Sequence, residues 1–209
     1  MGESDLHRFL KYIGLAYLHN QRCVLTATEV RLRKPTGEEM DRDDRDNKYV
    51  IDVIGWGEKP VYETKHYSTG HPYKRKIGSR NILRGIEVKT SVLDFKNGFA
   101  SSGCNYHYLL TPMRLVNPTE LPNWMGLIEF NRYKFTCGYS SQTERFSWDG
   151  IKLVKNPKFI DLEERLVNAT MWELAKRANR MLIYHVLKEI QETLSNVIYD
   201  ASSGNKEEV

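Results

Sequence analysis

Two short hydrophobic stretches of this sequence carry charged residues where a buried strand normally has none. The first is Tyr-Val-Ile-Asp-Val-Ile at 49–54, which contains Asp52, and the second is Gly-Ile-Glu-Val-Lys at 85–89, which contains Glu87 and Lys89. Side chains along a strand alternate between the two faces of a sheet, so Glu87 and Lys89 point to the same face. Burying an unpaired carboxylate or ammonium is costly. These charges must therefore be paired, bound to a metal ion, or exposed at a strand end.

The composition fits one folded domain with a substantial core. The chain has 209 residues, of which 40% are hydrophobic. It has no run of about 18 apolar residues, so no membrane span is expected. The first residues have neither the basic start nor the apolar stretch of a signal peptide, which predicts a cytoplasmic, intracellular protein. The three widely spaced cysteines argue against a disulfide framework or a cysteine-rich metal site.

Positive charge is concentrated in one part of the sequence, although the net charge of +4 is modest. Residues 38–46 are mostly acidic and are expected to lie in a solvated loop, whereas residues 58–84 are strongly basic. Tyrosines are interleaved with the basic residues, and this mixture can follow a phosphate backbone and stack on exposed bases. A solvated surface hairpin is the alternative. The candidate nucleic-acid-binding residues of this segment are Lys65, Lys74, Arg75, Lys76, Arg80 and Arg84.

The pattern of apolar residues predicts a helix, then a series of strands, then a helical C-terminal part. Residues 4–19 carry an apolar stripe at helical spacing, with Ser4 as the N-cap. A short helix is expected after Lys89, and a polar loop at 34–47. This order predicts an α/β fold in which a central mixed β-sheet is flanked by helices. Strands are expected at 22–32, 49–54, 85–89, 106–111, 125–130 and 150–154.

Three parts are expected along the chain. Residues 1–160 form the core, within which residues 55–84 are a basic insertion that folds as a hairpin or a partly ordered loop. Residues 161–200 are helices that pack on the core or form the seam of a homodimer, because apolar residues repeat there at helical spacing. The polar tail, residues 201–209, is expected to be disordered.

The charged residues of the two strands suit the hydrolysis of a phosphodiester. This reaction needs an activated water and compensation for the negative charge that develops on the phosphate. Carboxylates that hold Mg²⁺ or Mn²⁺ supply both, because hard cations prefer oxygen ligands and acidify bound water. Asp52, Glu87 and the backbone carbonyl of Val88 are the candidate metal ligands. Lys89 can orient the water or stabilise the developing charge.

The same residues resemble the PD-(D/E)XK nuclease superfamily. Asp52 stands as the first acid, and residues 87–89 stand as the E-x-K element. The run 87–95 is similar to the E-[IV]-K-[ST]-S-x-x-D-F signature of the MmcB-like DNA-repair branch. The resemblance covers roughly residues 5–112. It implies a restriction-endonuclease-like core and a metal-dependent deoxyribonuclease, with Mg²⁺ or Mn²⁺ as cofactor and DNA as partner.

Three further residues enter through this resemblance. Glu29 is a candidate for an additional metal-binding carboxylate, and its alternative is an exposed strand residue that pairs with an arginine. Ser91 is a candidate for binding phosphate or the metal shell. Asp94 either caps the following helix or enters the site. The interval from Asp52 to Glu87 is long, so the expected tight hairpin carries the basic insertion.

The leading hypothesis is therefore a nuclease that acts in DNA repair, recombination or restriction, as an endonuclease rather than an exonuclease. One alternative is a nucleic-acid-binding module that keeps the nuclease fold without cleaving. Another is a structural ion pair between Lys89 and the two acids, which predicts that Asp52→Asn strongly destabilises the fold. The nuclease hypothesis predicts little loss of stability or a gain, because clustered acids repel each other without metal. The sequence has no Walker loop, G-x-S-x-G or HExxH motif that would support a rival chemistry.

Overall fold

A computed structural model describes residues 4–32, 50–98 and 103–203. The polar loop expected at 34–47, with its acidic run, lies outside the described residues. The elements are α1 (Asp5–Asn20), β1 (Leu25–Arg31), β2 (Val50–His66), β3 (Pro72–Val88), α2 (Val92–Lys96), β4 (Tyr106–Pro112), β5 (Met125–Phe130), β6 (Thr136–Ser140), β7 (Arg145–Asp149), β8 (Ile151–Lys155) and α3 (Glu164–Ser203).

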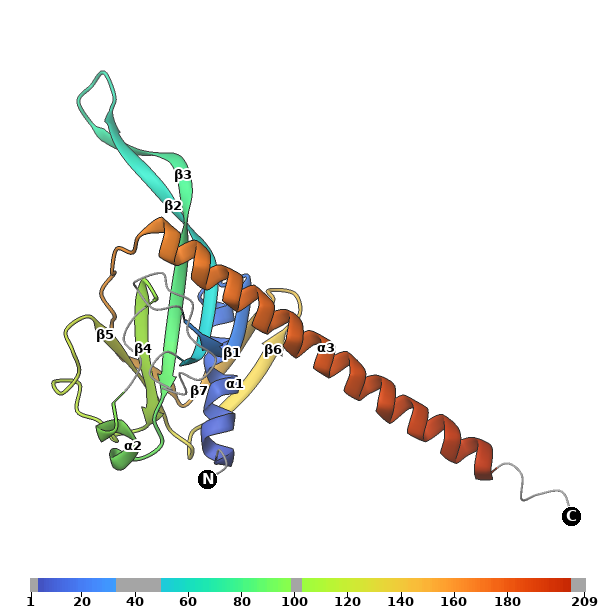
Figure 1. Ribbon diagram of the computed structural model, residues 1–209. Coiled ribbons are helices and arrows are strands. Elements are labelled where there is room, and N and C mark those ends of the chain that lie inside the picture. Colours follow the sequence, from blue (N-terminus) through green and yellow to red (C-terminus); the bar gives the residue numbers. More distant parts are fainter. Residues whose placement is uncertain (1–3, 33–49, 99–102, 204–209) are drawn as a thin grey trace, which may run out of the picture.

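A six-stranded sheet with the order β1-β2-β3-β4-β5-β8 forms the centre of the molecule. The strands β1, β2 and β3 pair antiparallel, β3, β4 and β5 pair parallel, and β8 closes the sheet antiparallel to β5. Helices α1 and α3 lie on either side of this sheet (Figure 1). The expected α/β fold with a central mixed sheet and flanking helices is confirmed.

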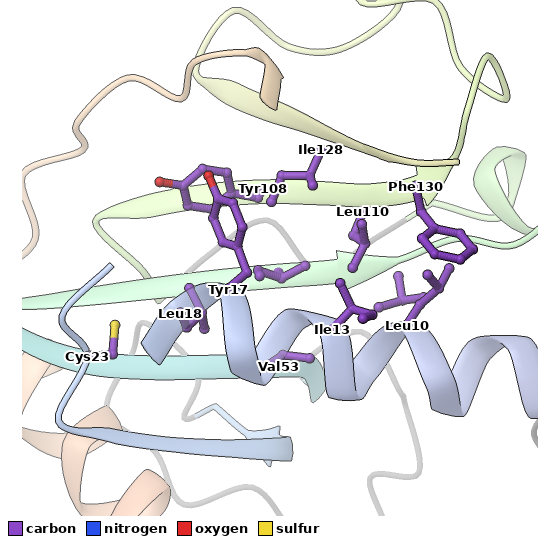
Figure 2. Packing of buried hydrophobic residues seen from close by; sticks show 12 residues of the cluster. Leu10, Ile13, Tyr17, Leu18, Cys23, Val53, Tyr108, Leu110, Ile128 and Phe130 are labelled. Carbon is purple, nitrogen blue, oxygen red and sulfur yellow. The ribbon is translucent and has the colours of Figure 1, made fainter. Parts of the chain in front are cut away.

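Helix α1 covers one face of the sheet, as its apolar stripe predicts. Ser4 caps it, because its side chain accepts a hydrogen bond from the backbone N–H of His7. Figure 2 shows Leu10, Ile13 and Tyr17 directed from α1 toward the strands, where they meet side chains of β2, β4 and β5. Close contact is possible because Gly14 has no side chain, and a Cβ there would lie 3.0 Å from Val53.

The first part of α3 covers the opposite face. Val167 and Leu174 are buried against residues of β1, β2 and β3, including Ala27 and Ile54. The apolar spacing expected for this region is confirmed, but it belongs to a single helix rather than to several. That helix continues to Ser203. It therefore includes residues 201–203, which were expected to belong to a disordered tail. Residues 204–209 lie outside the described part.

Strands β2 and β3 form one long hairpin that extends beyond the rest of the sheet. Each strand has 17 residues, so residues 50–54 and 85–88 belong to much longer strands than expected. Neighbouring strands end early: β1 pairs with β2 only as far as Trp56, and β4 pairs with β3 only from Arg84. Residues 57–83, here called the arm, are therefore two-stranded. The base of the arm, including Ile82 and Leu83, is buried in the body, and the outer part projects from it (Figure 1). The expected insertion is a continuation of both strands.

One hairpin was not predicted from the sequence. Strands β6 and β7 form a separate two-stranded sheet beside the C-terminal end of α1. The side-chain amide of Asn20 exchanges two hydrogen bonds with the backbone of Phe146, at 2.7 and 3.0 Å. Trp148 stacks on Tyr17 with ring centroids 6.2 Å apart.

Among the described residues, no helix is both long and apolar enough to cross a membrane.

Candidate active site

A cavity of about 810 Å³ lies where the ends of β1, β2 and β3 meet helices α1 and α3. Its position follows from the sheet, because the two antiparallel pairings bring the start of β2 beside the ends of β1 and β3. We call this cavity the cleft. Its lining residues are mostly charged: His7, Lys11, Glu29, Arg31, Val50, Asp52, Glu87, Val88, Lys89, Glu173, Lys176, Arg177 and Arg180.

Asp52 lies in the cleft as an ionised, well-bonded carboxylate. Its Oδ2 accepts a hydrogen bond of 2.8 Å from the backbone N–H of Val88. Its Oδ1 lies 3.4 Å from Nε2 of His7 and 3.5 Å from Nζ of Lys11. Burial acts to raise the pKa of Asp52, but the hydrogen bonds from His7 and Val88, with the charges of His7 and Lys11, hold it below its ordinary value.

Glu87 lies beside Asp52, but it is more deeply buried and has fewer hydrogen-bond partners. Only 5% of its surface is exposed, and its Oε1 has no hydrogen-bond partner among the described residues. Burial and the negative charge of Asp52 raise its pKa well above the ordinary glutamate value, although the charges of Lys89 and Lys11 act in the opposite direction. The sequence prediction that these two acids converge is therefore correct.

The lysine that contacts the acids is not the one expected from the sequence. Lys11 is buried, and its ammonium lies 3.0 Å from Oε1 of Glu29 as well as 3.5 Å from Asp52. Lys89 instead contacts Asp94, at 3.3 Å. The hypothesis of an ion pair centred on Lys89 is thus replaced by one centred on Lys11. The sequence contains a pattern that could have indicated this role of Lys11. His7, Lys11 and the buried Gly14 follow one another at helical spacing on one face of α1.

Glu29 lies opposite Asp52 in the register of β1 and β2, between the pairs Thr28–Val53 and Val30–Ile51. Its backbone has a φ of +55°, which is strained for a residue with a side chain. The Oε2 atom of Glu29 lies 2.9 Å from Nη2 of Arg177. The pairing with an arginine, considered from the sequence, is thus present, and Glu29 also borders the cleft.

Helix α3 supplies one wall of the cleft, which the sequence did not predict. Arg177 fixes this wall, because its Nε donates a hydrogen bond of 2.9 Å to the carbonyl of Thr28. Three other charged residues of α3, Glu173, Lys176 and Arg180, line the same wall. No local pattern in the sequence connects this part of the chain with residues near its beginning.

Ser91 and Asp94 organise the start of α2. The Oγ of Ser91 accepts a hydrogen bond from the backbone N–H of Asp94 and so acts as the N-cap of α2. Asp94 accepts a hydrogen bond from the backbone N–H of Thr90 and holds the ammonium of Lys89. Ser91 is not among the residues that line the cleft, whereas Lys89 is. Asp94 therefore positions Lys89 at the rim of the site.

The basic residues predicted to bind nucleic acid fall into two groups. Arg80 and Arg84 brace the base of the arm: Arg80 pairs with Asp161 at 2.9 Å, and Arg84 lies over the ring of Tyr106. The other four lie in the outer part of the arm, where Lys65 is partly exposed and pairs with Glu63 at 3.5 Å. The remaining three are exposed: Lys74, Arg75 and Lys76.

The outer part of the arm is far from the cleft. The strand β2 runs from Asp52 at the cleft to His66 at the tip, about 45 Å at a rise of about 3.3 Å per residue. Figure 1 shows the tip of the hairpin at the opposite end of β2 and β3 from α2. At the tip, the rings of Tyr67 and Tyr73 lie 4.4 Å apart. The structure therefore does not bring the acids and the outer basic residues together.

The acids of the cleft are the residues that could hold a hard divalent cation. Within the described residues, no three or more His, Cys, Asp or Glu side chains are clustered closely enough to hold a metal ion. Asp52 and Glu87 are two interacting carboxylates that border the cleft. Buried Glu87 with an oxygen that lacks a partner is the kind of group that a divalent cation satisfies. Two such carboxylates match the way Mg²⁺ is bound in proteins, where few carboxylates and several waters complete the shell.

Comparisons with known proteins do not assign the chain to a family. No model of a known protein family matches it, and no curated protein matches it. A solved structure described as the SPO1766 protein of unknown function from Silicibacter pomeroyi is similar, with a TM-score of 0.44 and 19% sequence identity. That similarity covers 81% of this chain and 84% of the other.

Proposed function

We propose that this protein is a metal-dependent nuclease that hydrolyses phosphodiester bonds of DNA, in repair, recombination or restriction. The observation that carries the proposal is the pair of adjacent carboxylates in the cleft. Asp52 is held ionised, while Glu87 is buried with an oxygen that lacks a partner. A buried carboxylate in that condition is costly to the fold, and this cost is understandable if a cation binds there during function.

In this proposal, Asp52, Glu87 and the carbonyl of Val88 would hold Mg²⁺ or Mn²⁺, which would supply charge compensation and an acidified water. The protein supplies the rest of the site. Lys89, held by Asp94 at the rim of the cleft, orients the attacking water. The cationic residues of the α3 wall attract the phosphate backbone and align it with the acids. These wall residues are Lys176, Arg177 and Arg180.

A second candidate is a nucleic-acid-binding module that does not cleave. The observation that favours it is Lys11, whose ammonium lies between Glu29 and Asp52 and already compensates part of their charge. A resident ammonium competes with a divalent cation for the same carboxylates. The basic arm and the cationic α3 wall serve DNA binding under either candidate.

The test is cleavage of supercoiled plasmid DNA in the presence of Mg²⁺ or Mn²⁺. Wild-type protein is expected to nick the plasmid, and chelation with EDTA is expected to stop the reaction. Asp52→Asn and Glu87→Gln should each lower the rate by at least about 100-fold, since electrostatic contributions at such sites are of that size. The matched control is Asp149→Asn, which removes an exposed carboxylate of β7 outside the cleft.

Equal rates in wild type and Asp52→Asn would overturn the proposed chemistry, because the activity would then come from another source. Binding of DNA in a gel-shift assay without cleavage, on duplex, branched and single-stranded substrates alike, would favour the non-cleaving module. Loss of activity in Asp149→Asn as well would point to a general loss of folding, which far-ultraviolet circular dichroism would detect.

A further inference from the structure

The second part of α3 projects from the body of the protein. The helix still contacts the body at Met181, whose sulfur accepts a hydrogen bond from the hydroxyl of Thr28 at 3.8 Å. Every residue from 182 to 191 is exposed. Residues 182–203, here called the projecting segment, extend about 33 Å at about 1.5 Å per residue. Figure 1 shows this part of α3 leading away from all other elements.

The projecting segment carries large apolar side chains in water. Ile183 is 50% exposed, Leu187 53% and Ile190 49%. Their spacings of four and three residues are those of a heptad repeat, and the sequence continues the same spacing at Leu194 and Val197. In heptad notation, Leu187 and Leu194 occupy a positions, and Ile183, Ile190 and Val197 occupy d positions.

A helix with this surface is not stable by itself. Isolated helices of this length are marginal in water, and most helical stability in proteins comes from packing an apolar face. Burying such side chains against a partner removes apolar surface from water and stabilises the helix. Continuous exposed apolar surface of this kind marks an interaction site. The segment therefore requires an occupant for its apolar face.

We propose that copies of this same chain occupy that face, so that the projecting segments of several molecules form a parallel helical bundle. The positions beside the seam decide the partner, because the e and g residues of facing helices meet one another. Over residues 183–197 they are uncharged: Tyr184 and Gln191 at e, and Val186 and Thr193 at g. Identical helices therefore meet without repulsion between like charges, and no charge at these positions selects a different partner.

The charged residues between 183 and 197 lie away from the seam. Lys188 and Glu189 fall at b and c positions, and His185, which pairs with Glu189 at 3.2 Å, falls at f. Leucine at a combined with isoleucine at d favours assemblies of more than two helices. The apolar residue at g, Val186, widens the apolar face in the way that such assemblies need. Association through this face does not depend on the proposed nuclease activity.

The test is the mass of the full-length protein in solution, measured by sedimentation equilibrium across a wide range of concentrations. Wild type is expected to associate reversibly into oligomers larger than a monomer. The double variant Leu187→Lys with Ile190→Lys is expected to sediment as a monomer. The matched control is His185→Lys, which adds charge to the same helix at an f position and should associate like wild type.

A wild-type protein that is monomeric at all concentrations, or a double variant that associates like wild type, would overturn the inference. Covalent capture provides a second measurement. In a Cys137→Ser background, which removes the one cysteine that is exposed among Cys23, Cys104 and Cys137, Ile190→Cys should form a disulfide between chains on mild oxidation. His185→Cys at the outer position should not, and equal cross-linking of both variants would contradict a specific seam.

Discussion

Asp52 and Glu87 are neighbouring carboxylates whose pKa values are shifted in opposite directions by their surroundings. Asp52 has a backbone N–H and two basic side chains around it, whereas Glu87 has a buried position and a negatively charged neighbour. A carboxyl group with a lowered pKa stabilises the folded state above its ordinary pKa and loses that contribution as the pH falls. A carboxyl group with a raised pKa does the reverse, and it weakens the fold as the pH rises above its ordinary value.

We therefore predict that Glu87→Gln stabilises the metal-free protein at pH 8, and that this gain shrinks as the pH is lowered toward 4. The reason is that the raised pKa of Glu87 weakens the fold at pH values above the ordinary glutamate pKa, and glutamine does not titrate and so has no such cost. Urea unfolding at several pH values in EDTA measures the effect, with Glu120→Gln as an exposed control. A Glu87→Gln protein that is less stable than wild type at pH 8 would contradict the predicted direction.

Asp52→Asn should behave in the opposite way and cost about 1–3 kcal/mol at neutral pH, because it weakens a buried hydrogen-bonded charge. The small effect that the nuclease hypothesis predicted from the sequence considered only the repulsion between the acids, whereas Val88 and Lys11 stabilise the Asp52 carboxylate in the structure. The sequence predicted both acids, since a carboxylate among apolar strand residues is a local anomaly. It did not predict which lysine would contact them. Lys11 belongs to α1 and Lys89 follows β3, and only the packing of the helix on the sheet decided between them.

At the scale of elements, the helices and the strands of the main sheet were largely predictable because each has a clear apolar period. What could not be predicted was how α3 returns to the beginning of the sheet. Arg177 contacts Glu29 across 148 positions of sequence, and no local pattern encodes such a contact. The β6–β7 hairpin was missed for a related reason, because its strands are mostly exposed and lack a buried apolar pattern.

The docking of α3 gives a prediction at this scale. Arg177→Met removes the hydrogen bond to the Thr28 carbonyl and the ion pair with Glu29, so it should lower the free energy of unfolding by about 1–3 kcal/mol. Urea denaturation followed by circular dichroism measures it. The control Lys176→Met removes an exposed pair with Glu173 within the same helix and should change stability by less than about 0.5 kcal/mol. Equal losses in both variants would show that Arg177 does not anchor the helix.

At the scale of the whole molecule, the cleft and the tip of the arm are separated by about 45 Å along β2. A straight duplex rises about 3.4 Å per base pair, so about 13 base pairs are needed to span them. If the protein cleaves duplex DNA as proposed, the arm can assist only on substrates longer than this. Shorter substrates can reach the acids and the arm only in separate binding events.

We predict that Lys74→Ala combined with Lys76→Ala lowers kcat/KM on a 30-base-pair duplex and leaves kcat/KM on a 10-base-pair duplex nearly unchanged. The salt dependence of binding to the long duplex should also become less steep, by about one unit of slope for each phosphate that the arm no longer neutralises. The control is Lys134→Ala with Lys152→Ala, which removes two exposed lysines outside the arm. Equal reductions on both lengths would mean that the arm does not act at a distance from the cleft.

Both strand edges of the arm are open to other molecules. At the base of β3, Asn105 hydrogen-bonds the backbone N–H and C=O of Leu83. Farther out, neither strand has another neighbouring strand among the described residues, so both edges present backbone N–H and C=O groups. Such edges are templates for intermolecular strand pairing, and lysines and prolines are the residues that commonly prevent it. Pro60 lies on one edge strand and the lysines of the tip on both. Their charges therefore also protect the protein from aggregation, independently of any ligand.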